Sequence, residues 1–194
     1  MSVLGNGLYN ANQYEDALTV REARLSSMRR LGAPEGEILG TKGNLAGTYG
    51  ILGREEEALG LNREVYYGFL KLSGKEHEQT LTAALNLADS LRIMQRFKEA
   101  KTLLRKTTPV ARRVLGESND LTLKLRNIYA LALCNDGDAT LNDLREAATT
   151  LEDAVRTARR LLGSAHPTTR MTEENLRHAR AALRARKTLR PGNA

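Results

Sequence analysis

The sequence contains few of the residues on which several common kinds of protein depend. Its 194 residues include one cysteine, no tryptophan and 4% aromatic residues. A single cysteine excludes an internal disulfide framework, a zinc site of several thiolates and a dithiol redox pair. No apolar run approaches the roughly 20 residues that cross a bilayer. Residues 1–10 lack the basic and apolar segments of a signal peptide. We therefore expect a soluble, cytoplasmic protein with no membrane partner.

The composition is nevertheless that of a folded chain. Hydrophobic residues make up 41% of the sequence and are evenly spread, which is too high a fraction for a disordered chain. Residues 1–144 hold 19 basic and 18 acidic side chains, whereas residues 145–194 hold 11 and 5. Most of the net charge of +7 therefore belongs to the C-terminal quarter of the sequence.

Three short patterns recur along the chain at nearly the same interval. A glycine follows each long apolar segment, an Asn-Leu pair occurs inside other segments, and an alanine directly follows an acidic residue. The glycine steps are 42, 42 and 47 residues, and the first Asn-Leu step is also 42. The positions are Gly32, Gly74, Gly116 and Gly163; Asn44, Asn86 and Asn175; and Ala17, Ala58, Ala100 and Ala147. A shared period of this size is typical of repeat architectures.

The periodicity within each repeat predicts two helices. In residues 81–94 apolar side chains recur three and four apart, as one helix face requires, and a second such pattern starts at Phe97. No run alternates with period two, so no strands are expected and the fold class is all-α. Small residues such as Ala46, Ala88 and Ala130 mark positions where two helix backbones approach closely, because a larger side chain would force them apart.

Turn and cap residues agree with this assignment. The four periodic glycines fit left-handed C-terminal helix caps, and Pro167 fits the first turn of a final helix. Pro109 falls inside a helix, so it should kink that helix or end its regular hydrogen bonding. The extra residues of the longest repeat fall around residues 135–139, where an Asn-Asp-Gly-Asp sequence predicts a lengthened surface loop.

The motifs resemble those of a known family. The segment Leu-Gly-Ser-Ala-His-Pro-Thr-Thr at residues 162–169, together with the Asn-Leu-Ala and Phe-x-Glu-Ala patterns, is similar to the 42-residue tetratricopeptide repeats of kinesin light chains and their relatives. The resemblance covers roughly residues 14–183. It implies a right-handed α-solenoid of helical hairpins that acts as a non-catalytic scaffold and binds a protein or peptide segment in its concave groove.

The repeat pattern and this resemblance together predict one tetratricopeptide repeat domain over residues 1–190. Solenoids need a capping element with a polar outer face, and the last helix fits that role. The hairpins are expected at about 1–32, 36–74, 78–116 and 119–163, with a capping helix at about 167–189 and a tail at 191–194.

The resemblance places the Asn-Leu asparagines, Asn44, Asn86 and Asn175, on the concave surface. An amide both donates and accepts, so it can pair with the backbone of an extended peptide. Alternatively, these amides bond the neighbouring helix and fix the repeat spacing. The third repeat has Ile128 at this position, with Asn127 beside it. Nearby basic residues, Lys42 and Lys124, favour an acidic ligand. Apolar residues near the N-terminal edge, Leu4 and Leu8, would allow a homo-oligomer.

A basic stripe on the last helix offers a second interpretation. Its members lie three or four residues apart and so share one helix face; they are Arg177, Arg180, Arg184 and Lys187. This stripe could bind nucleic acid or another polyanion, or it could be the solvated face of a capping helix. No aromatic residue interleaves the arginines to stack on bases, so nucleic acid is the less favoured partner.

Catalytic and metal sites are not expected. His77 and His166 occupy the same repeat position, so a turn or cap role is the simplest interpretation. Cys134 fits a small buried hydrophobe. The chain has no Gly-rich phosphate loop and no His-Glu-x-x-His pair, and residues 135–138 lack the spacing of a calcium loop. We therefore predict no enzyme activity, no metal and no cofactor.

Overall fold

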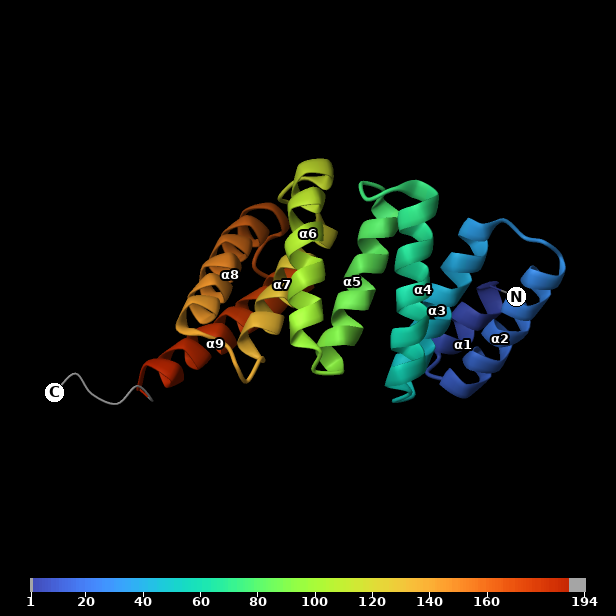
Figure 1. The fold of residues 1–194 in the computed structure, drawn as a ribbon, viewed down its shortest axis with the longest axis horizontal. Helices are drawn as coiled ribbons and strands as arrows, with labels where there is room; N and C mark the ends of the chain where they lie inside the picture. The colour runs from blue at the N-terminus through green and yellow to red at the C-terminus, as the bar shows by residue number, and fades with distance from the viewer. Residues whose placement is uncertain (1, 189–194) are drawn as a thin grey trace. The chain divides into compact units, whose positions relative to one another are not determined.

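The fold is described over residues 2–188 by a computed structural model of the chain (Figure 1). Within these residues the backbone forms nine α-helices and no strand, so the all-α prediction is confirmed. The helices are α1 (Ser2–Asn10), α2 (Tyr14–Arg30), α3 (Glu35–Ile51), α4 (Glu55–Ser73), α5 (Glu78–Ile93), α6 (Phe97–Leu115), α7 (Asp120–Cys134), α8 (Leu141–Leu162) and α9 (Pro167–Thr188). None of these helices combines the length and apolar character needed to cross a membrane.

The helices lie within the hairpin ranges expected from the sequence to within one residue. Residue 189 of the expected capping helix and the tail at 191–194 lie outside the described residues. The chain divides into two compact units, a first unit up to Met94 and a second unit from Gln95. This boundary falls between α5 and α6, inside the hairpin expected at 78–116. A single domain over residues 1–190 stays a prediction.

The two periodic histidines begin helices, as the sequence analysis predicts. His77 precedes α5, and its ring Nδ1 accepts a hydrogen bond from the backbone N–H of Gln79 at 3.2 Å. His166 precedes α9, and its Nδ1 accepts from the N–H of Thr168 at the same distance. Each ring therefore satisfies one of the backbone donors that a helix N-terminus leaves without an intrahelical partner.

The glycine caps differ in part from the expected left-handed form. All four periodic glycines have positive φ. At Gly32 the N–H groups of Gly32 and Ala33 return to the carbonyls of Arg29 and Met28, which is the Schellman arrangement. The caps after α4, α6 and α8 instead combine φ of 80–89° with ψ of 161–171°. This conformation is also essentially restricted to glycine, but it extends the chain rather than closing a left-handed cap.

Pro109 lies inside α6 and does not end the helix; the kink that the sequence also allows stays a prediction. The helix runs unbroken from Phe97 to Leu115. A proline ring removes only one backbone donor, the bond that would return to Arg105. Leu104 and Ala111, on either side of the proline, are fully buried.

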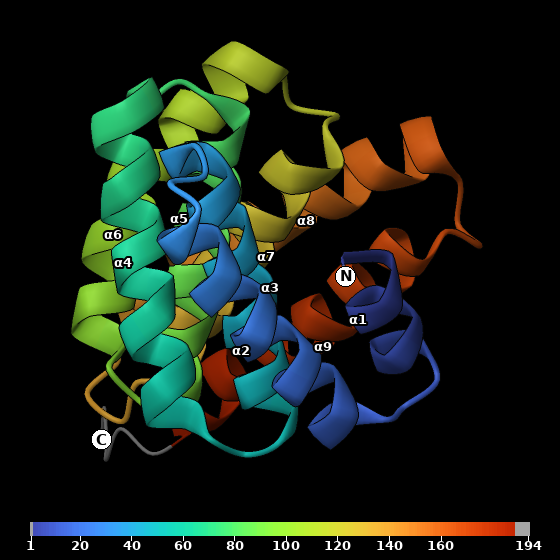
Figure 2. The same ribbon diagram turned by 90° about the vertical axis from the view of Figure 1, so that its right-hand side faces the viewer.

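In the first unit each helix packs against the next one along the chain (Figures 1 and 2). Two apolar clusters form part of its core. The first consists of Leu18, Leu25, Leu45, Tyr49 and Ala58, and the second of Leu39, Val65, Phe69 and Ala83. Burial of one such leucine or phenylalanine contributes about 1.5–3 kcal/mol. The second cluster joins α3, α4 and α5 and forms the floor of the site described below.

In the second unit α7 packs against α6, α8 and α9, and α9 also packs against α8. Leu123 of α7 is fully buried against Ala154 and Ala158 of α8. Residues 135–140 form the expected loop between α7 and α8. In this loop Asp136 binds Lys101 at 2.7 Å and accepts from the N–H of Asp138. These bonds lower the pKa of Asp136.

The periodic alanines are buried, as close helix packing requires. Each has an exposed fraction of 2% or less. They are Ala17, Ala46, Ala58, Ala88, Ala100, Ala130 and Ala147. The small residues therefore mark helix contacts in both units, which confirms that part of the sequence analysis.

Three buried threonines at one repeat position, Thr80, Thr122 and Thr169, have hydroxyl groups without a hydrogen-bond partner among the described residues. A buried hydroxyl without a partner lowers stability, and valine has nearly the same shape. We expect Thr122→Val to raise the free energy of unfolding by about 1 kcal/mol. Urea denaturation followed by circular dichroism measures this change.

Thr107 is the matched control for this substitution. Its side chain is also buried, but its hydroxyl donates to the carbonyl of Leu103 at 3.0 Å. Thr107→Val should therefore not raise stability. A Thr122→Val protein that is less stable than wild type would contradict the assignment of an unpaired hydroxyl.

Candidate functional site

The first unit contains a hollow of about 530 Å³ between α3, α4 and α5, which we call the α3–α5 hollow. Its floor is apolar, because Leu39, Val65, Phe69 and Ala83 of the second cluster line it. Polar residues form the other half of the lining; they are Asn44, His77, Glu78, Gln79, Thr82 and Asn86. A hollow that combines an apolar floor with polar groups can hold a ligand and fix its orientation.

Two asparagines predicted from the sequence lie at this hollow. Asn44 of α3 and Asn86 of α5 both line it, and both are exposed. Among residues 2–188 neither side-chain amide has a hydrogen-bond partner. The alternative in which these two amides bond a neighbouring helix is therefore not what the structure has. Each amide can donate and accept toward the hollow.

The wall that α3 contributes to the hollow consists largely of glycine. Gly40 and Gly43 line it on the same face as Asn44. A Cβ atom at Gly40 would meet no other atom within 4 Å, so packing within the chain does not require this glycine. A glycine inside a helix lowers stability by about 1 kcal/mol relative to alanine. Its effect here is to keep the α3 backbone accessible from the hollow.

Close packing of α3 on α4 holds the floor of the hollow in place. A Cβ atom at Gly68 of α4 would lie 2.5 Å from Cδ2 of Leu39, closer than real Cβ contacts. Leu39 is 1% exposed. The absence of a side chain at Gly68 therefore gives Leu39 the room in which it forms the apolar floor.

A smaller hollow of about 350 Å³, between α1 and α3, also has Asn44 in its lining. Arg21 of α2 reaches it and joins three helices. Its guanidinium donates to Oδ1 of Asn6 at 2.9 Å, to the carbonyl of Asn44 at 2.8 Å and to Thr48. It also lies over the ring of Tyr9, 4.8 Å from the centroid. Burial lowers the pKa of Arg21. No sequence pattern distinguishes it from its neighbouring arginines, so the sequence analysis missed it.

The two lysines predicted near the groove are each paired with a carboxylate. Lys42 lies 2.8 Å from Glu64 of α4, and Lys124 lies 2.6 Å from Asp120 of its own helix. Burial alone would raise the pKa of Asp120, but hydrogen bonds from Lys124 and from Thr168 of α9 outweigh it, so the pKa is lowered. Neither lysine therefore presents a free charge to a ligand.

The second-unit asparagines are used within the fold. Asn127 of α7 is 1% exposed, and its amide donates to the carbonyl of Leu123 and to Thr172 of α9, both at 2.9 Å. Asn175 of α9 donates to Oδ1 of Asn127 at 2.9 Å. A groove role for Asn127 is therefore excluded by its burial. This pair follows the alternative interpretation, in which the amides bond a neighbouring helix.

The basic stripe of α9 is partly neutralised. Its four members are exposed, as expected for one helix face. Arg180 pairs with Glu152 of α8 at 2.8 Å. Within the described part of the chain Arg177, Arg184 and Lys187 have no ion-pair partner. The stripe thus keeps three of its four charges available to an anion.

The groups that catalysis would use do not gather in the described residues. Burial raises the pKa of the Cys134 thiol to about 11, so it is not a thiolate at neutral pH. His178 bonds Asn135 at 3.0 Å. Between residues 2 and 188 no three His, Cys, Asp or Glu side chains lie close enough to share a metal ion.

Models of known protein families match the sequence over its repeats. Two models described as tetratricopeptide repeat match the sequence, one over residues 37–113 and the other over residues 139–168. Together they match more than half of the chain. No relative of the sequence is found among curated proteins.

Solved structures match almost the whole fold. Two structures of a putative kinesin light chain from Podosopora anserina, with nearly identical tetratricopeptide-like repeats, have TM-scores of 0.80 and 0.78 and 22% identity. Both matches cover 95% of this chain, and they cover 85% and 86% of the other chains. BtubC (BKLC) from P. vanneervenii has a TM-score of 0.76 and 18% identity, and the match covers 100% of this chain and 82% of that one. These likenesses confirm the fold class of a helical-repeat solenoid.

Proposed function

Because the chain belongs to the tetratricopeptide repeat family, we propose that it is a non-catalytic protein-interaction scaffold whose α3–α5 hollow holds an extended peptide segment of a partner. The resemblance to the repeats of kinesin light chains is confirmed for family and fold, and the fold supports a protein-binding role. The peptide site itself is our proposal. The observation that supports it most strongly is the pair of amides, Asn44 and Asn86, which line a hollow with an apolar floor and have no partner among the described residues.

The chemistry of the hollow suits an extended peptide. A peptide backbone carries one donor and one acceptor per residue, and the two amides can bond both without selecting a particular side chain. Each such bond would contribute about 1 kcal/mol net. The apolar floor under Leu39 and Phe69 suits an apolar side chain of the ligand. A peptide held in this way would bind in the micromolar range, about −8 kcal/mol.

Preorganisation makes such binding possible. The hollow is built from three helices that share one apolar cluster, and Arg21 ties the α3 backbone at Asn44 to α1 and α2. Because the site is already formed, the protein loses little conformational entropy on binding, and most of the loss falls on the ligand. Asn86 remains part of the proposed site, whereas Lys42 is paired with Glu64 and does not line the hollow.

The finer features of the ligand follow from the charges. The pairing of Lys42 and Lys124 with carboxylates gives an acidic peptide little advantage, so we propose a ligand without a required acidic residue.

Polyanion binding by the α9 stripe is the second candidate, and the three unpaired basic residues of that stripe favour it. Of the two apolar residues expected at the N-terminal edge, Leu4 is exposed and Leu8 is half-buried. Association through Leu4 and the exposed Val3 would make a homo-oligomer. We place the protein in the cytoplasm.

Removal of one groove amide tests the proposal. Peptides are first selected on the wild-type protein from a random peptide display library, and the affinity of a selected peptide is then measured by isothermal titration calorimetry. We expect Asn86→Ala to weaken binding about fivefold, as loss of one hydrogen bond of about 1 kcal/mol predicts. Helicity should stay unchanged, because Asn86 makes no contact within the described residues that helix packing needs.

Asn142→Ala is the matched control. Asn142 is an exposed asparagine on α8 whose amide oxygen accepts only from Arg145. Its replacement should leave peptide affinity unchanged. Equal affinities for wild type and Asn86→Ala would refute the amide contact. A steep fall of affinity with salt would instead favour the polyanion candidate, because binding of a polyanion releases counterions.

A further inference from the structure

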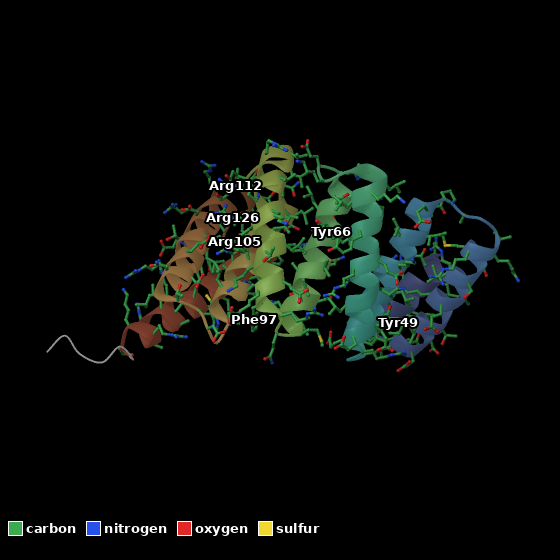
Figure 3. The ribbon with its side chains drawn as sticks, viewed as in Figure 1. Tyr49, Tyr66, Phe97, Arg105, Arg112 and Arg126 are labelled. Carbon is green, nitrogen blue, oxygen red and sulfur yellow. The ribbon has the colours of Figure 1, made fainter. Side chains whose placement is uncertain are left out.

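The second unit contains a concentration of arginine that the proposed peptide site does not use. Four arginines surround a hollow of about 490 Å³ between α6, α7 and α8, which we call the arginine hollow. They are Arg112 of α6, Arg126 of α7, and Arg156 and Arg160 of α8. Figure 3 shows Arg112 and Arg126 close together although they come from different helices.

Only two carboxylates oppose these four charges. Glu117, in the loop after α6, accepts from Arg112 at 2.7 Å through Oε1 and from Arg126 at 3.2 Å through Oε2. Asp153 pairs with Arg156 one turn away on α8. Among the described residues Arg160 has no partner. The lining of the hollow therefore carries an excess of two positive charges.

One of the four arginines is fixed inside the protein. Arg126 is 6% exposed and also donates to the carbonyl of Thr150 at 3.0 Å. Burial and the nearby charge of Arg112 lower the pKa of Arg126, but a guanidinium stays protonated in proteins. A buried positive charge is unfavourable unless it is paired. The single carboxylate of Glu117, shared between two guanidiniums, leaves this pairing incomplete.

We propose that the arginine hollow binds a phosphate monoester dianion, carried by a phosphorylated serine or threonine of a peptide partner. A guanidinium presents several N–H donors in a plane that matches phosphate oxygens. The doubly charged group would balance the excess of two positive charges in the lining, and Arg112, Arg126 and Arg160 are the guanidiniums that would bind it. Glu117 accepts from both Arg112 and Arg126 in this structure, so its carboxylate competes with such an anion for these two guanidiniums.

The hollow is less suited to nucleic acid. Its lining includes no aromatic ring on which a base could stack. It also lies between helices rather than along an exposed helix face. The proposal concerns the second unit alone and stands independently of the peptide site in the α3–α5 hollow.

The arginine side chains themselves report binding. The Nε–Hε signals of ¹⁵N-labelled protein are followed by NMR at constant ionic strength during addition of a blocked Gly-phosphoserine-Gly peptide. We expect saturable shifts at Arg112, Arg126 and Arg160 and none with the unphosphorylated peptide. Weaker binding of inorganic phosphate than of the phosphopeptide would assign the ligand to a peptide, and equal binding would assign it to the free anion; both support a phosphate site.

Three variants sharpen the test. Arg160→Gln should weaken phosphopeptide binding about tenfold, the effect of one lost charge-assisted bond. Glu117→Gln should strengthen it severalfold, because the competing carboxylate is removed. Arg170→Gln, an exposed arginine of α9 outside the hollow, is the control and should change nothing. Shifts that only follow ionic strength, an equal effect of Arg170→Gln, or tighter binding of a short RNA than of the phosphopeptide would overturn the proposal.

Discussion

Replacement of Gly40 by leucine is expected to weaken peptide binding about a hundredfold while raising the stability of the protein. Gly40 lines the α3–α5 hollow, so a leucine there would occupy the space that we assign to the ligand. Overfilling a packed site costs about 1–3 kcal/mol, and the upper part of that range corresponds to a hundredfold in affinity.

The rise in stability has a separate cause. A Cβ atom at Gly40 would meet nothing within 4 Å, and Gly40 is exposed, so we expect the helix to accept a side chain there. Leucine favours a helix over glycine by about 0.8 kcal/mol. Binding and stability should therefore change in opposite directions, which separates a blocked site from a misfolded protein. Calorimetry with a library-selected peptide and urea denaturation measure the two effects.

Gly60→Leu is the matched control for this variant. Gly60 is an exposed glycine inside α4 whose Cβ would also meet nothing within 4 Å, and it does not line the hollow. The same gain in stability is expected there, with peptide affinity unchanged. If Gly40→Leu and Gly60→Leu bound the peptide equally well, the ligand could not occupy the α3–α5 hollow.

Replacement of Asn127 by alanine is expected to lower the free energy of unfolding by about 2–3 kcal/mol. The amide joins α7 to α9 through Thr172 and Asn175. Alanine removes these hydrogen bonds and leaves a small cavity between the helices, and both effects lower stability. Urea denaturation of the variant measures the loss.

The control for Asn127→Ala is Asn44→Ala. Asn44 is an exposed asparagine of α3 whose side chain has no partner among residues 2–188, so its replacement should change stability by no more than about 0.5 kcal/mol. Peptide affinity should show the reverse order, with a loss at Asn44 and none at Asn127. Equal stability losses in the two variants would contradict the buried network between α7 and α9.

The repeat period predicts the helices well because one periodic signal is repeated in several independent copies. Ala88 and Ala130 are buried as expected, and His77 and His166 cap helices as expected. These features depend on local backbone geometry and on contacts between neighbouring helices. Both kinds of constraint recur with the period, so each copy reinforces the prediction made from the others.

The prediction for Asn127 failed because one residue changes the direction of a helical side chain by about 100°. Ile128 occupies the repeat position of Asn86, so Asn127 lies on a different face of its helix from the groove asparagines. The sequence did not predict the hydrogen-bond partner of Asn175 in α9 either. Asn175 occupies the repeat position of Asn44, yet its amide bonds Asn127.

The arginine hollow was missed for a different reason. The arginines at the ends of the second helices have a local explanation, since cations stabilise the C-terminal ends of helices. Arg113 and Arg160 share one repeat position, and this repetition was the available signal. Only the packing of α7 against α6 and α8 shows that such ends, together with Arg126, surround one hollow.

The central claim is that a partner peptide binds against the amides of Asn44 and Asn86. Side-chain amide signals of ¹⁵N-labelled protein during titration with a library-selected peptide test it most directly. The account predicts that both signals shift and saturate at the dissociation constant found by calorimetry. Saturable binding that leaves both signals unmoved and instead shifts signals of the α9 arginines would contradict it.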